Sequence, residues 1–445
     1  MTGALVLAGP PRPDLAGGVD AAADRLLALA AGAFGRRLDP DSDAPVAVGF
    51  SGGGDSLALL LAARAWTRAA GRRLLALTVD HGLQPQSATW ARSARETARS
   101  LGVESLALAW HGDKPAAGLP ARARRARHAL LAEAARAAGA RVILLGHTRD
   151  DLMESAQMRA EGSSPGDPRE WAPSPVWPEG REVFLLRPLL GAGRAQLRAL
   201  LSGTGLDWID DPANDDPAFA RARARAAPSA AAVAREAAPG VADASALARA
   251  AQVDDFGRIA IAREALLGAS PRAARRFLAA ACVCAGGGES LPRRRQVEAL
   301  HARVMSGERF AAGLAGARVE AGERLEVFRE AGAPLRRTPG VWDGRFAISG
   351  LEPGAEVRAL RGLASRLPPA ERRRLGEIPA SARPGLPAIV QGDGESVTCP
   401  ILAQGSEASA RSLVGRRLGA ACDVFAREQE VRTGPDGEPA EGALS

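Results

Sequence analysis

The fold of this chain is decided by the stretch Val46-Ala47-Val48-Gly49-Phe50-Ser51-Gly52-Gly53-Gly54-Asp55-Ser56. Its first half is an apolar run that predicts a buried strand, and the apolar segment 57–70 beyond it predicts a helix. The three glycines between them allow backbone N–H groups to converge on one point, where the helix amino end adds partial positive charge. Ser51 and Ser56 add hydroxyl donors. The turn is therefore predicted to hold phosphate.

Asp55 distinguishes this turn from the common P-loop, which carries a Lys beside Ser or Thr after four spacer residues. A carboxylate among phosphate-binding amides repels phosphate unless a divalent metal ion or a proton lies between them. We therefore expect Asp55 to hold a metal ion. The alternative is a glycine-rich turn between strand and helix that binds no ligand.

The composition is that of a globular protein. Hydrophobic residues make up 46% of the 445 residues, a length that favours about two to four domains. No apolar run approaches the roughly 20 residues of a transmembrane helix, so no membrane association is expected. Residues 1–20 hold three prolines and lack a basic start before a long apolar core. We interpret them as a loose leader rather than a signal peptide.

The charge balance indicates an anionic partner. The formal net charge is +7 and the sequence pI is about 10.4, which suits nucleic acid. Lys114 is the only Lys, however, and such a bias toward Arg is equally what a GC-rich genome produces. The cysteines lack the paired spacing of a metal site, and we expect them to be buried thiols of a reducing cytosol: Cys282, Cys284, Cys399 and Cys422.

Residues 45–227 are predicted to form an α/β domain with a parallel sheet. Apolar strands alternate there with Ala-, Leu- and Arg-rich helices. The expected strands are 46–50, 74–79, 103–109, 141–146 and 183–186, and the expected helices are 57–70, 87–101, 119–138, 150–160 and 193–203. Ligands collect at the carboxyl ends of such strands. Polar motifs follow three of these ends, at 51–56, 80–82 and 147–151, which predicts one shared site.

The rest of the chain is predicted to be divided as follows. Residues 163–181 are rich in Pro, Gly, Ser and Trp and are expected to form a long loop. The expected parts are a leader and helix (1–44), the α/β domain (45–227), a mostly helical domain (228–335), a small α+β or β-rich domain (336–432) and a disordered tail (433–445).

Two further motifs support a site. Asp80-His81-Gly82 follows a strand, where these residues border a nucleotide or, alternatively, cap the next helix. In the helix 121–128, Arg124 and Arg127 share one face and Arg122 and Arg125 share another. Such faces suit phosphate groups, whereas the alternative is a solvated helix surface.

His147 precedes two adjacent carboxylates at the start of a predicted helix. Asp151 and Glu154 are three residues apart and lie on one helix face, and Asp150 points elsewhere. One or two carboxylates together with ATP phosphates suffice for Mg²⁺. The alternative is ordinary helix capping. Further on, Asp210-Asp211-Pro212-Ala213-Asn214 precedes alternating arginines that suit a segment held between phosphate and carboxylate partners: Arg221, Arg223 and Arg225.

Ser-Gly-Gly-x-Asp-Ser resembles the loop of the PP-loop ATP pyrophosphatases, and the full set of motifs resembles tRNA(Ile)-lysidine synthetase. That family pairs SGGxDS with VDHGLR, ARxxRY, a His-Asp-Asp segment, RPLL and DPSN…RNRIR. Here the motifs read SGGGDS, VDHGLQ, ARRARH, HTRDDLMES, RPLL (187–190) and DPAN…RARAR. The resemblance covers about 45–226 and is weaker beyond. It implies that 45–227 is the PP-loop ATP-binding catalytic domain and that 228–335 is a tRNA-binding domain.

The resemblance implies a ligase of the cytoplasm that uses ATP and Mg²⁺. Such an enzyme adenylates the wobble cytidine of an isoleucine tRNA with a CAU anticodon, and free L-lysine then displaces AMP to form lysidine. The implied ATP-binding residues are Ser51, Gly52, Gly53, Gly54, Asp55, Ser56, Asp80 and His81. The implied catalytic residues are Asp55, Arg124, His147 and Asp151, with Asp55 and Asp151 on the metal. The implied tRNA or substrate contacts are Arg127, Asp150, Glu154, Arg221, Arg223 and Arg225. Asp55, Asp151 and His147 all remain candidates to accept the lysine proton, and the oligomeric state is left open.

The chain departs from the family pattern at four motif positions. His128 stands where the family has Tyr, Gln84 where it has Arg, Thr148 where it has a second His, and Ala222 where it has Asn. These changes put in doubt a stacking role at His128 and a phosphate contact at Gln84.

Two other functions compete with this interpretation. One is another PP-loop tRNA-modifying enzyme such as a 2-thiolation enzyme, which needs Cys in the ATP domain, whereas no Cys precedes Cys282. The other is a non-catalytic module that senses ATP, for which loss of Asp55 or of the Asp150-Asp151 pair would have been evidence. Both features are present.

Overall fold

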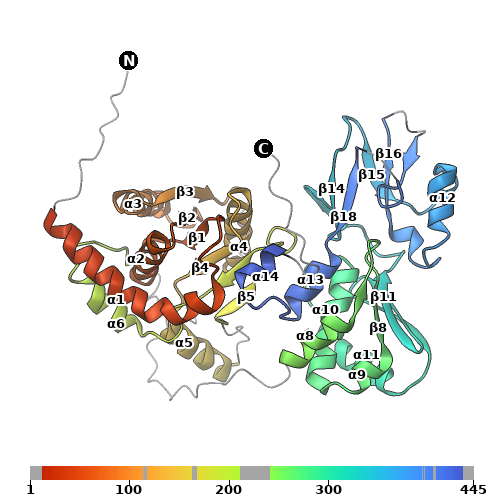
Figure 1. Cartoon of the computed structure of the whole chain (residues 1–445), viewed down its shortest axis with the longest axis horizontal. Helices are drawn as coiled ribbons and strands as arrows, with labels where there is room; N and C mark the ends of the chain where they lie inside the picture. Colours follow the sequence, from red (N-terminus) through yellow and green to blue (C-terminus); the bar gives the residue numbers. More distant parts are fainter. Residues whose placement is uncertain are drawn as a thin grey trace. The chain divides into compact units, whose positions relative to one another are not determined.

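The computed structural model places the chain in two compact units, each described here by itself (Figure 1). The first unit comprises residues 1–235 together with 426–445, and the second comprises 236–425. The residues that the structure describes are 13–112, 114, 118–162, 168–210, 241–392, 394, 396–403 and 407–433.

A six-stranded sheet forms the centre of the first unit, in the order β3-β2-β1-β4-β6-β5. The strands are β1 (Val46–Gly49), β2 (Leu74–Asp80), β3 (Glu104–Ala109), β4 (Val142–Leu145), β5 (Trp171–Pro173) and β6 (Phe184–Leu186). All neighbouring pairs are parallel except β5 with β6. The predicted parallel-sheet α/β fold is thereby confirmed.

The strand order creates a switch point beside β1. From β1 the chain builds β2 and β3 on one side, and it then crosses to β4 on the other side. At such a point the following connections diverge, which leaves a crevice outside the carboxyl ends of the two strands. The glycine-rich turn follows β1 and the segment at His147 follows β4, so both open into this crevice.

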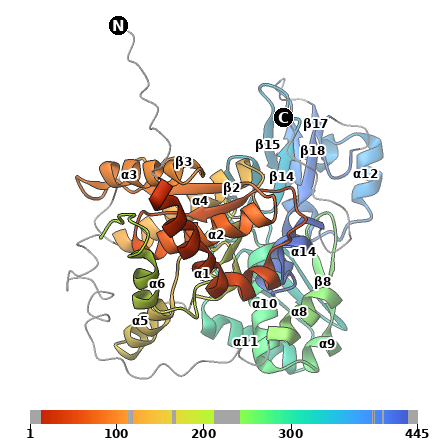
Figure 2. The ribbon, with the colours of Figure 1, turned by 60° about the vertical axis from the view of Figure 1, so that its left-hand side comes forward.

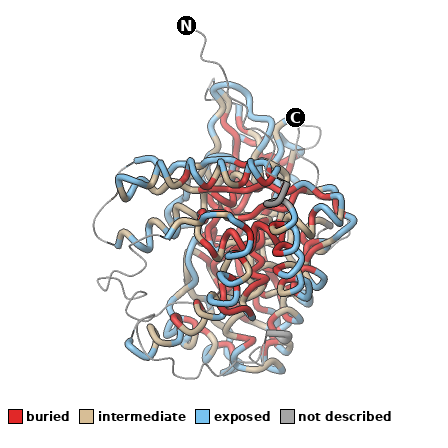
Figure 3. Tube along the Cα trace, turned by 90° about the vertical axis from the view of Figure 1, so that its left-hand side faces the viewer, coloured by how far each residue is buried: buried red, intermediate tan, exposed pale blue. Residues whose placement is uncertain are grey.

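Helices bury the sheet. Helix α2 (Gly54–Ala69) is buried from Leu57 to Ala63, and α1 (Pro13–Arg37) lies along it (Figures 1 and 2). Helix α4 (Leu119–Ala137) packs Leu131 and neighbouring alanines onto side chains of β1, β4 and β6. The remaining helices of this unit are α3 (Ser87–Ser100), α5 (Arg149–Ala160) and α6 (Arg194–Leu201). Figure 3 shows the buried inner segments in red and the exposed turns in pale blue.

Two expectations for this unit are corrected. The leader predicted for residues 1–20 is wrong from Pro13 onward, because α1 begins there with Pro in a position that its fixed backbone angle suits. Residues 1–12 lie outside the described part. The loop predicted for 163–181 contains β5, which is held by stacking of Trp171 on Phe184 with ring centroids 4.9 Å apart. Residues 163–167 lie outside the described part.

The chain returns to the first unit at its carboxyl end. Helix α14 (Glu428–Thr433) brings Glu428 against Arg72 at 2.7 Å, and both side chains are essentially inaccessible to solvent. The same carboxylate accepts the main-chain N–H of Asp39 at 3.0 Å. This segment therefore lies with the amino-terminal unit rather than with the 336–432 part to which the sequence assigned it. The tail from 434 lies outside the described residues.

The stretch 228–335, expected to be mostly helical, contains four helices in its described part, but it also supplies a five-stranded antiparallel sheet that was not predicted. The strands, in the order β7-β8-β11-β10-β9, are Gln252–Val253, Ile259–Ala262, Arg324–Arg329, Ala317–Ala321 and Phe310–Leu314. Helix α10 (Pro271–Ala285) packs Phe277 and Leu278 into the same core as the inner faces of β10 and β11. Ala and Gly are uncommon in strands, so the Ala- and Gly-rich sequence of these half-buried strands does not predict a sheet. The other helices of this stretch are α8 (Val241–Ala250), α9 (Arg263–Leu267) and α11 (Arg294–Met305).

The part beyond residue 335 contains two small sheets, as the α+β prediction requires. One has the order β12-β13-β14-β18 (Arg337–Thr338, Val341–Trp342, Phe346–Ser349, Ser409–Ser412). The other has the order β15-β16-β17 (Glu356–Ala359, Pro387–Val390, Val397–Thr398). Helices α12 (Pro369–Leu375) and α13 (Val414–Ala421) accompany them. Among the described residues of the whole chain, no helix is both long and apolar enough to span a membrane.

Candidate functional site

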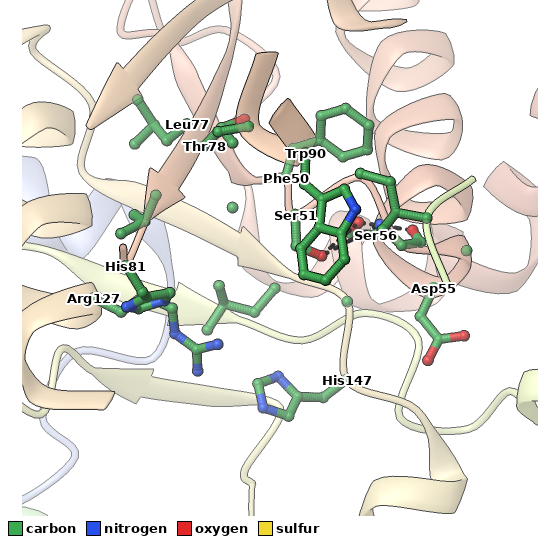
Figure 4. A pocket seen from close by; sticks show the side chains of 18 of the residues that line it. Phe50, Ser51, Asp55, Ser56, Leu77, Thr78, His81, Trp90, Arg127 and His147 are labelled. Atoms are coloured by element: carbon green, nitrogen blue, oxygen red, sulfur yellow. Dashed lines mark hydrogen bonds between the residues drawn. The ribbon is translucent and has the colours of Figure 1, made fainter. Parts of the chain in front are cut away.

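A cavity of about 530 Å³ opens at the carboxyl ends of β1, β2 and β4 (Figure 4). Among the predicted site residues, the cavity is lined by Ser51, Gly53, Gly54, Asp55, Ser56, His81, Arg127, His147 and Asp151. The three strand-end motifs thus meet in one place, as the topology requires. Figure 4 shows side chains of all three around one space.

The glycine-rich turn has a defined internal geometry. Ser51 Oγ lies 3.1 Å from Ser56 Oγ, and Ser56 Oγ donates a hydrogen bond to the carbonyl of Gly53 at 2.8 Å. Gly52 has φ +83°, and its carbonyl accepts the N–H of Ile209 at 2.9 Å. A Cβ on Gly52 would lie 2.5 Å from Cδ1 of Ile209, so a side chain here would be both strained and in collision. Residues just beyond α6 therefore close one side of the turn.

Asp55 lies in the first turn of α2, and its two carboxylate oxygens differ in their hydrogen bonding. Oδ2 accepts a hydrogen bond from Arg194 Nε at 2.9 Å, whereas Oδ1 is buried and has no hydrogen-bond partner among the residues that the structure describes. Burial raises the pKa of Asp55, and the hydrogen bond and charge of Arg194 oppose that shift. A carboxylate oxygen with unused acceptor capacity fits a divalent cation. The described residues contain no group of three or more His, Cys, Asp or Glu able to hold a metal, so phosphate oxygens and water would have to complete its shell.

Each of the three carboxylates of α5 has a hydrogen-bond partner, and Asp150 and Glu154 share Arg194. Asp151 Oδ2 accepts hydrogen bonds from the main-chain N–H of Thr148 at 2.8 Å and from its hydroxyl at 3.0 Å, so the capping interpretation holds for this residue. Asp150 Oδ2 accepts the main-chain N–H of Arg194 at 2.8 Å. Glu154 is buried, and its Oε1 accepts a hydrogen bond from Arg194 Nη1 at 3.1 Å. Asp151 lines the cavity, whereas Asp150 and Glu154 do not.

Arg194 is the main functional candidate that the sequence analysis missed. It lines the cavity from the first turn of α6 and lies within 4 Å of carboxylates from both α2 and α5. Burial by itself lowers its pKa, but hydrogen bonds and charges of Asp55 and Glu154 outweigh burial and raise it. One Arg among so many carries no local signal. Its position shortly after the RPLL segment, at a helix start, is the only indication that the sequence offers.

At the end of β2 the cavity is lined by His81 but not by Asp80. Asp80 Oδ1 instead accepts the N–H of Gly82 at 2.8 Å, which shapes the turn. His81 lies edge-on to Trp110, and its Nδ1 is buried with no hydrogen-bond partner in the described part of the chain. Burial, followed by the charge of Arg127, lowers the pKa of His81, so the imidazole is neutral at pH 7.

Helix α4 turns Arg127 into the cavity and buries His128 beside it. Within the described ranges, neither ring nitrogen of His128 has a hydrogen-bond partner, and burial together with the charges of Arg127 and Arg124 lowers its pKa to about 2. Arg124 is exposed and does not line the cavity, as is also true of Arg122 and Arg125. Of the two arginines predicted to share the site face, the structure therefore brings only Arg127 to the cavity wall.

An apolar wall completes the cavity and was not predicted. It is formed by Phe50, Leu77, Leu83 and Trp90. Trp90, which comes from α3, lines the same cavity as the serines of the glycine-rich turn, and Figure 4 draws its indole among these side chains. A flat aromatic ring in a cavity with a turn that is predicted to hold phosphate would provide a surface for a nucleobase. The predicted contacts Arg221, Arg223 and Arg225 lie outside the described residues.

Comparison with known proteins bears on this site. Residues 29–228 match the sequence profile of a PP-loop domain. A tRNA(Ile)-lysidine synthase of Caulobacter vibrioides is 48% identical over 415 residues, covering 89% of this chain and 97% of that protein. The tRNA(Ile)-lysidine synthase of Rhizobium meliloti is 37% identical over 350 residues, covering 71% and 75%. Among solved structures, the U34-tRNA thiolase NcsA from Methanococcus maripaludis, with its 4Fe–4S cluster, matches 47% of this chain and 72% of its own. That match has 16% identity and a TM-score of 0.38.

Proposed function

Because this chain belongs to the tRNA(Ile)-lysidine synthase family and carries a PP-loop domain that uses ATP, we propose that it joins free L-lysine to a tRNA base. The base is the wobble cytidine of an isoleucine tRNA with a CAU anticodon, and lysine is joined to its C2 atom. The observation that carries the proposal is the cavity itself, where a glycine-rich turn, a paired carboxylate and two histidines meet. Since tRNA is the substrate, we assign the reaction to the cytoplasm.

The reaction consists of two displacements. In the first, O2 of the cytosine attacks the α-phosphorus of ATP, and pyrophosphate leaves. In the second, a lysine amino group attacks C2, the C–O bond to the adenylate breaks, and AMP leaves. Cytosine O2 is a weak nucleophile, so the first step depends on neutralising the charge of the leaving pyrophosphate.

The turn and the carboxylates have distinct roles in this proposal. Backbone amides of Gly53 and Gly54, with the hydroxyls of Ser51 and Ser56, hold the pyrophosphate portion. Asp55, with Asp151, would hold Mg²⁺ together with phosphate oxygens. When bound, Mg²⁺ supplies positive charge to the phosphates.

The remaining predicted residues fall into inner and outer groups. His81 and Arg127 line the cavity and are proposed to contact the nucleotide or the adenylated base. Arg124 stands at the helix surface, so we propose that it meets phosphate of the tRNA rather than of ATP. Asp80 acts by shaping the turn that carries His81.

Lysine must attack as a neutral amine, so a base has to accept a proton. In this proposal Asp55 and Asp151 hold Mg²⁺, and each already accepts hydrogen bonds from the protein, so neither is assigned to accept the proton. His147 lines the same cavity, and an imidazole accepts a proton near neutral pH. We therefore propose His147 as the acceptor.

The test is mass spectrometry of nucleosides from an isoleucine tRNA transcript incubated with the protein, ATP, Mg²⁺ and lysine. The expected product is lysidine, and its formation requires lysine as well as ATP. With lysine left out, pyrophosphate release should stop after about one equivalent of tRNA is adenylated. A thiolated nucleoside would instead support the 2-thiolation alternative, against which stands the burial of all four cysteines. ATP binding without any tRNA product would support an ATP sensor.

A further inference from the structure

One guanidinium joins three carboxylates from two different elements in this cavity. Arg194 lies 2.9 Å from Asp55 of α2, and 3.1 Å from Glu154 and 3.8 Å from Asp151, both of α5. Gathering these like charges in a half-buried site is unfavourable unless a cation lies among them. The planar guanidinium directs Nε to one carboxylate and Nη1 to another at the same time, which an ammonium group cannot do.

The main chain of Arg194 is fixed as well as its side chain. Its N–H donates to Asp150 Oδ2 at 2.8 Å, so the amino end of α6 is tied directly to the first turn of α5. The preceding residue, Gly193, leaves room for this approach. A Cβ there would lie 2.8 Å from an Arg149 guanidinium nitrogen and 3.8 Å from the Asp150 carboxylate.

We propose that Arg194 is a positioning residue for the adenylation step. Its side chain holds the Asp55 carboxylate of the glycine-rich turn against α5. The hydrogen bond from its main-chain N–H to Asp150 holds the backbone of Arg194 in position. Without Arg194, Asp55 loses the partner that sets its rotamer, and three uncompensated carboxylates adjoin the triphosphate site. This inference rests on the proposed function, so wild-type protein assayed in parallel shows whether the reaction itself occurs.

The chain offers a matched comparison on the same helix. Arg198 lies one turn further along α6, also lines the cavity, and pairs with Asp210 at 2.8 Å. Both members of that pair are largely exposed, and Asp210 is the only carboxylate that the structure pairs with Arg198 in the described part of the chain. If any positive charge on α6 were sufficient, the two arginines would be equivalent.

The experiment measures single-turnover pyrophosphate release with tRNA for Arg194→Ala, Arg194→Lys and Arg198→Ala. Arg194→Ala should lower the rate by at least ~10²-fold, the scale of losing one preorganised charged group. Arg194→Lys should keep the KM for ATP within about threefold, because the charge remains, and still lower kcat at least ~10-fold, because the two-point geometry is lost. Arg198→Ala should lower the rate at least ~10-fold less than Arg194→Ala does, because its ion pair is largely exposed and involves none of the three carboxylates.

Guanidinium ion provides the decisive readout. Added well below the molar concentrations that unfold proteins, it should restore Arg194→Ala at least ~10-fold relative to NaCl of equal ionic strength, and it should not restore Arg198→Ala. A merely structural role would give no such rescue. Equal losses for both alanine variants, or equal recovery with NaCl, would overturn the proposal. If Arg194→Ala fails to fold, the kcat and KM of Arg194→Lys decide, and a wild-type kcat for that variant refutes it.

Discussion

Glu428→Ala tests whether the carboxyl end of the chain is an integral part of the ATP-binding unit. Glu428 receives two hydrogen bonds from Arg72, at 2.8 and 2.7 Å, and neither side chain is accessible to solvent. Removing one partner of a buried pair costs about 3–5 kcal/mol, because the other charge stays buried without compensation. Arg72 would keep its hydrogen bonds to the carbonyls of Ala44 and Asp39, so we expect the lower end, about 3 kcal/mol. That loss lowers the Tm of a unit of this size by roughly 6–12 °C.

The assay is urea unfolding followed by tryptophan fluorescence. Six of the seven Trp residues lie at or before Trp208, so the signal reports mainly on the first unit. Arg432→Ala is the matched control, because its pair with Asp43 belongs to the same helix α14 but is exposed. Its removal should cost less than about 1 kcal/mol.

A double variant shows whether Glu428→Ala lowers stability through the lost contacts or through the charge that it leaves buried without a partner. Replacing both members, Arg72→Met with Glu428→Met, removes the buried charges together and should recover most of the stability that Glu428→Ala loses. The reasoning is refuted if Glu428→Ala unfolds within about 1 kcal/mol of the wild type, the range of an exposed pair. It is also refuted if the double variant is no more stable than Glu428→Ala.

Three further outcomes are expected. Asp55→Asn should slow pyrophosphate release at least ~10²-fold at unchanged Tm, since it removes the charge among the phosphate-binding amides; a wild-type rate would contradict the metal assignment. Combined Ala substitution of the exposed Arg272, Arg293 and Arg295 should weaken tRNA binding and reduce its salt slope, with an unchanged KM for ATP, as filter binding at several salt concentrations would reveal. His128 has a pKa of about 2 when folded against about 6.5 when unfolded, so its contribution to stability is lost as pH falls below 6.5. Between pH 7 and 5 the wild type should lose about 2 kcal/mol more unfolding free energy than His128→Phe, and equal losses would contradict the buried neutral imidazole.

The sheet of the first unit could be predicted because its strands are continuous apolar runs. The central strands β1, β4 and β6 are buried on both faces, whereas the edge strand β3 is largely exposed, and each expected strand is found within one or two residues of its observed bounds. The sheet beyond residue 250 could not be predicted in the same way. Strand β9 reads Phe-Ala-Ala-Gly-Leu and alternates between half-buried and exposed residues, so neither its composition nor its hydrophobicity distinguishes it from a helix.

The residues of the site likewise divide into those that the sequence could predict and those that it could not. Ser51 to Ser56, His81 and His147 follow strands directly, so topology alone brings them together. Arg194 and Trp90 belong to helices, and which of their residues face the cavity depends on how the helices pack. The sequence around a single helical residue does not show whether its side chain points toward the cavity. His128 shows the reverse case, in which a residue at a motif position is buried behind the wall rather than exposed in it.

The interactions that a sequence motif cannot reveal are those that join distant segments through charge. Arg194 and Asp55 are separated by 139 positions, and Arg72 and Glu428 by 356. In both pairs an arginine compensates a carboxylate that burial would otherwise destabilise, so each partner explains why the other is tolerated. A chain in which almost every basic residue is Arg obscures such pairs, because composition makes every arginine look alike. Burial and partner distinguish them: Arg72 pairs with Glu428 out of reach of solvent and Arg194 pairs with Asp55 in a half-buried site, whereas Arg198 pairs with Asp210 at the surface.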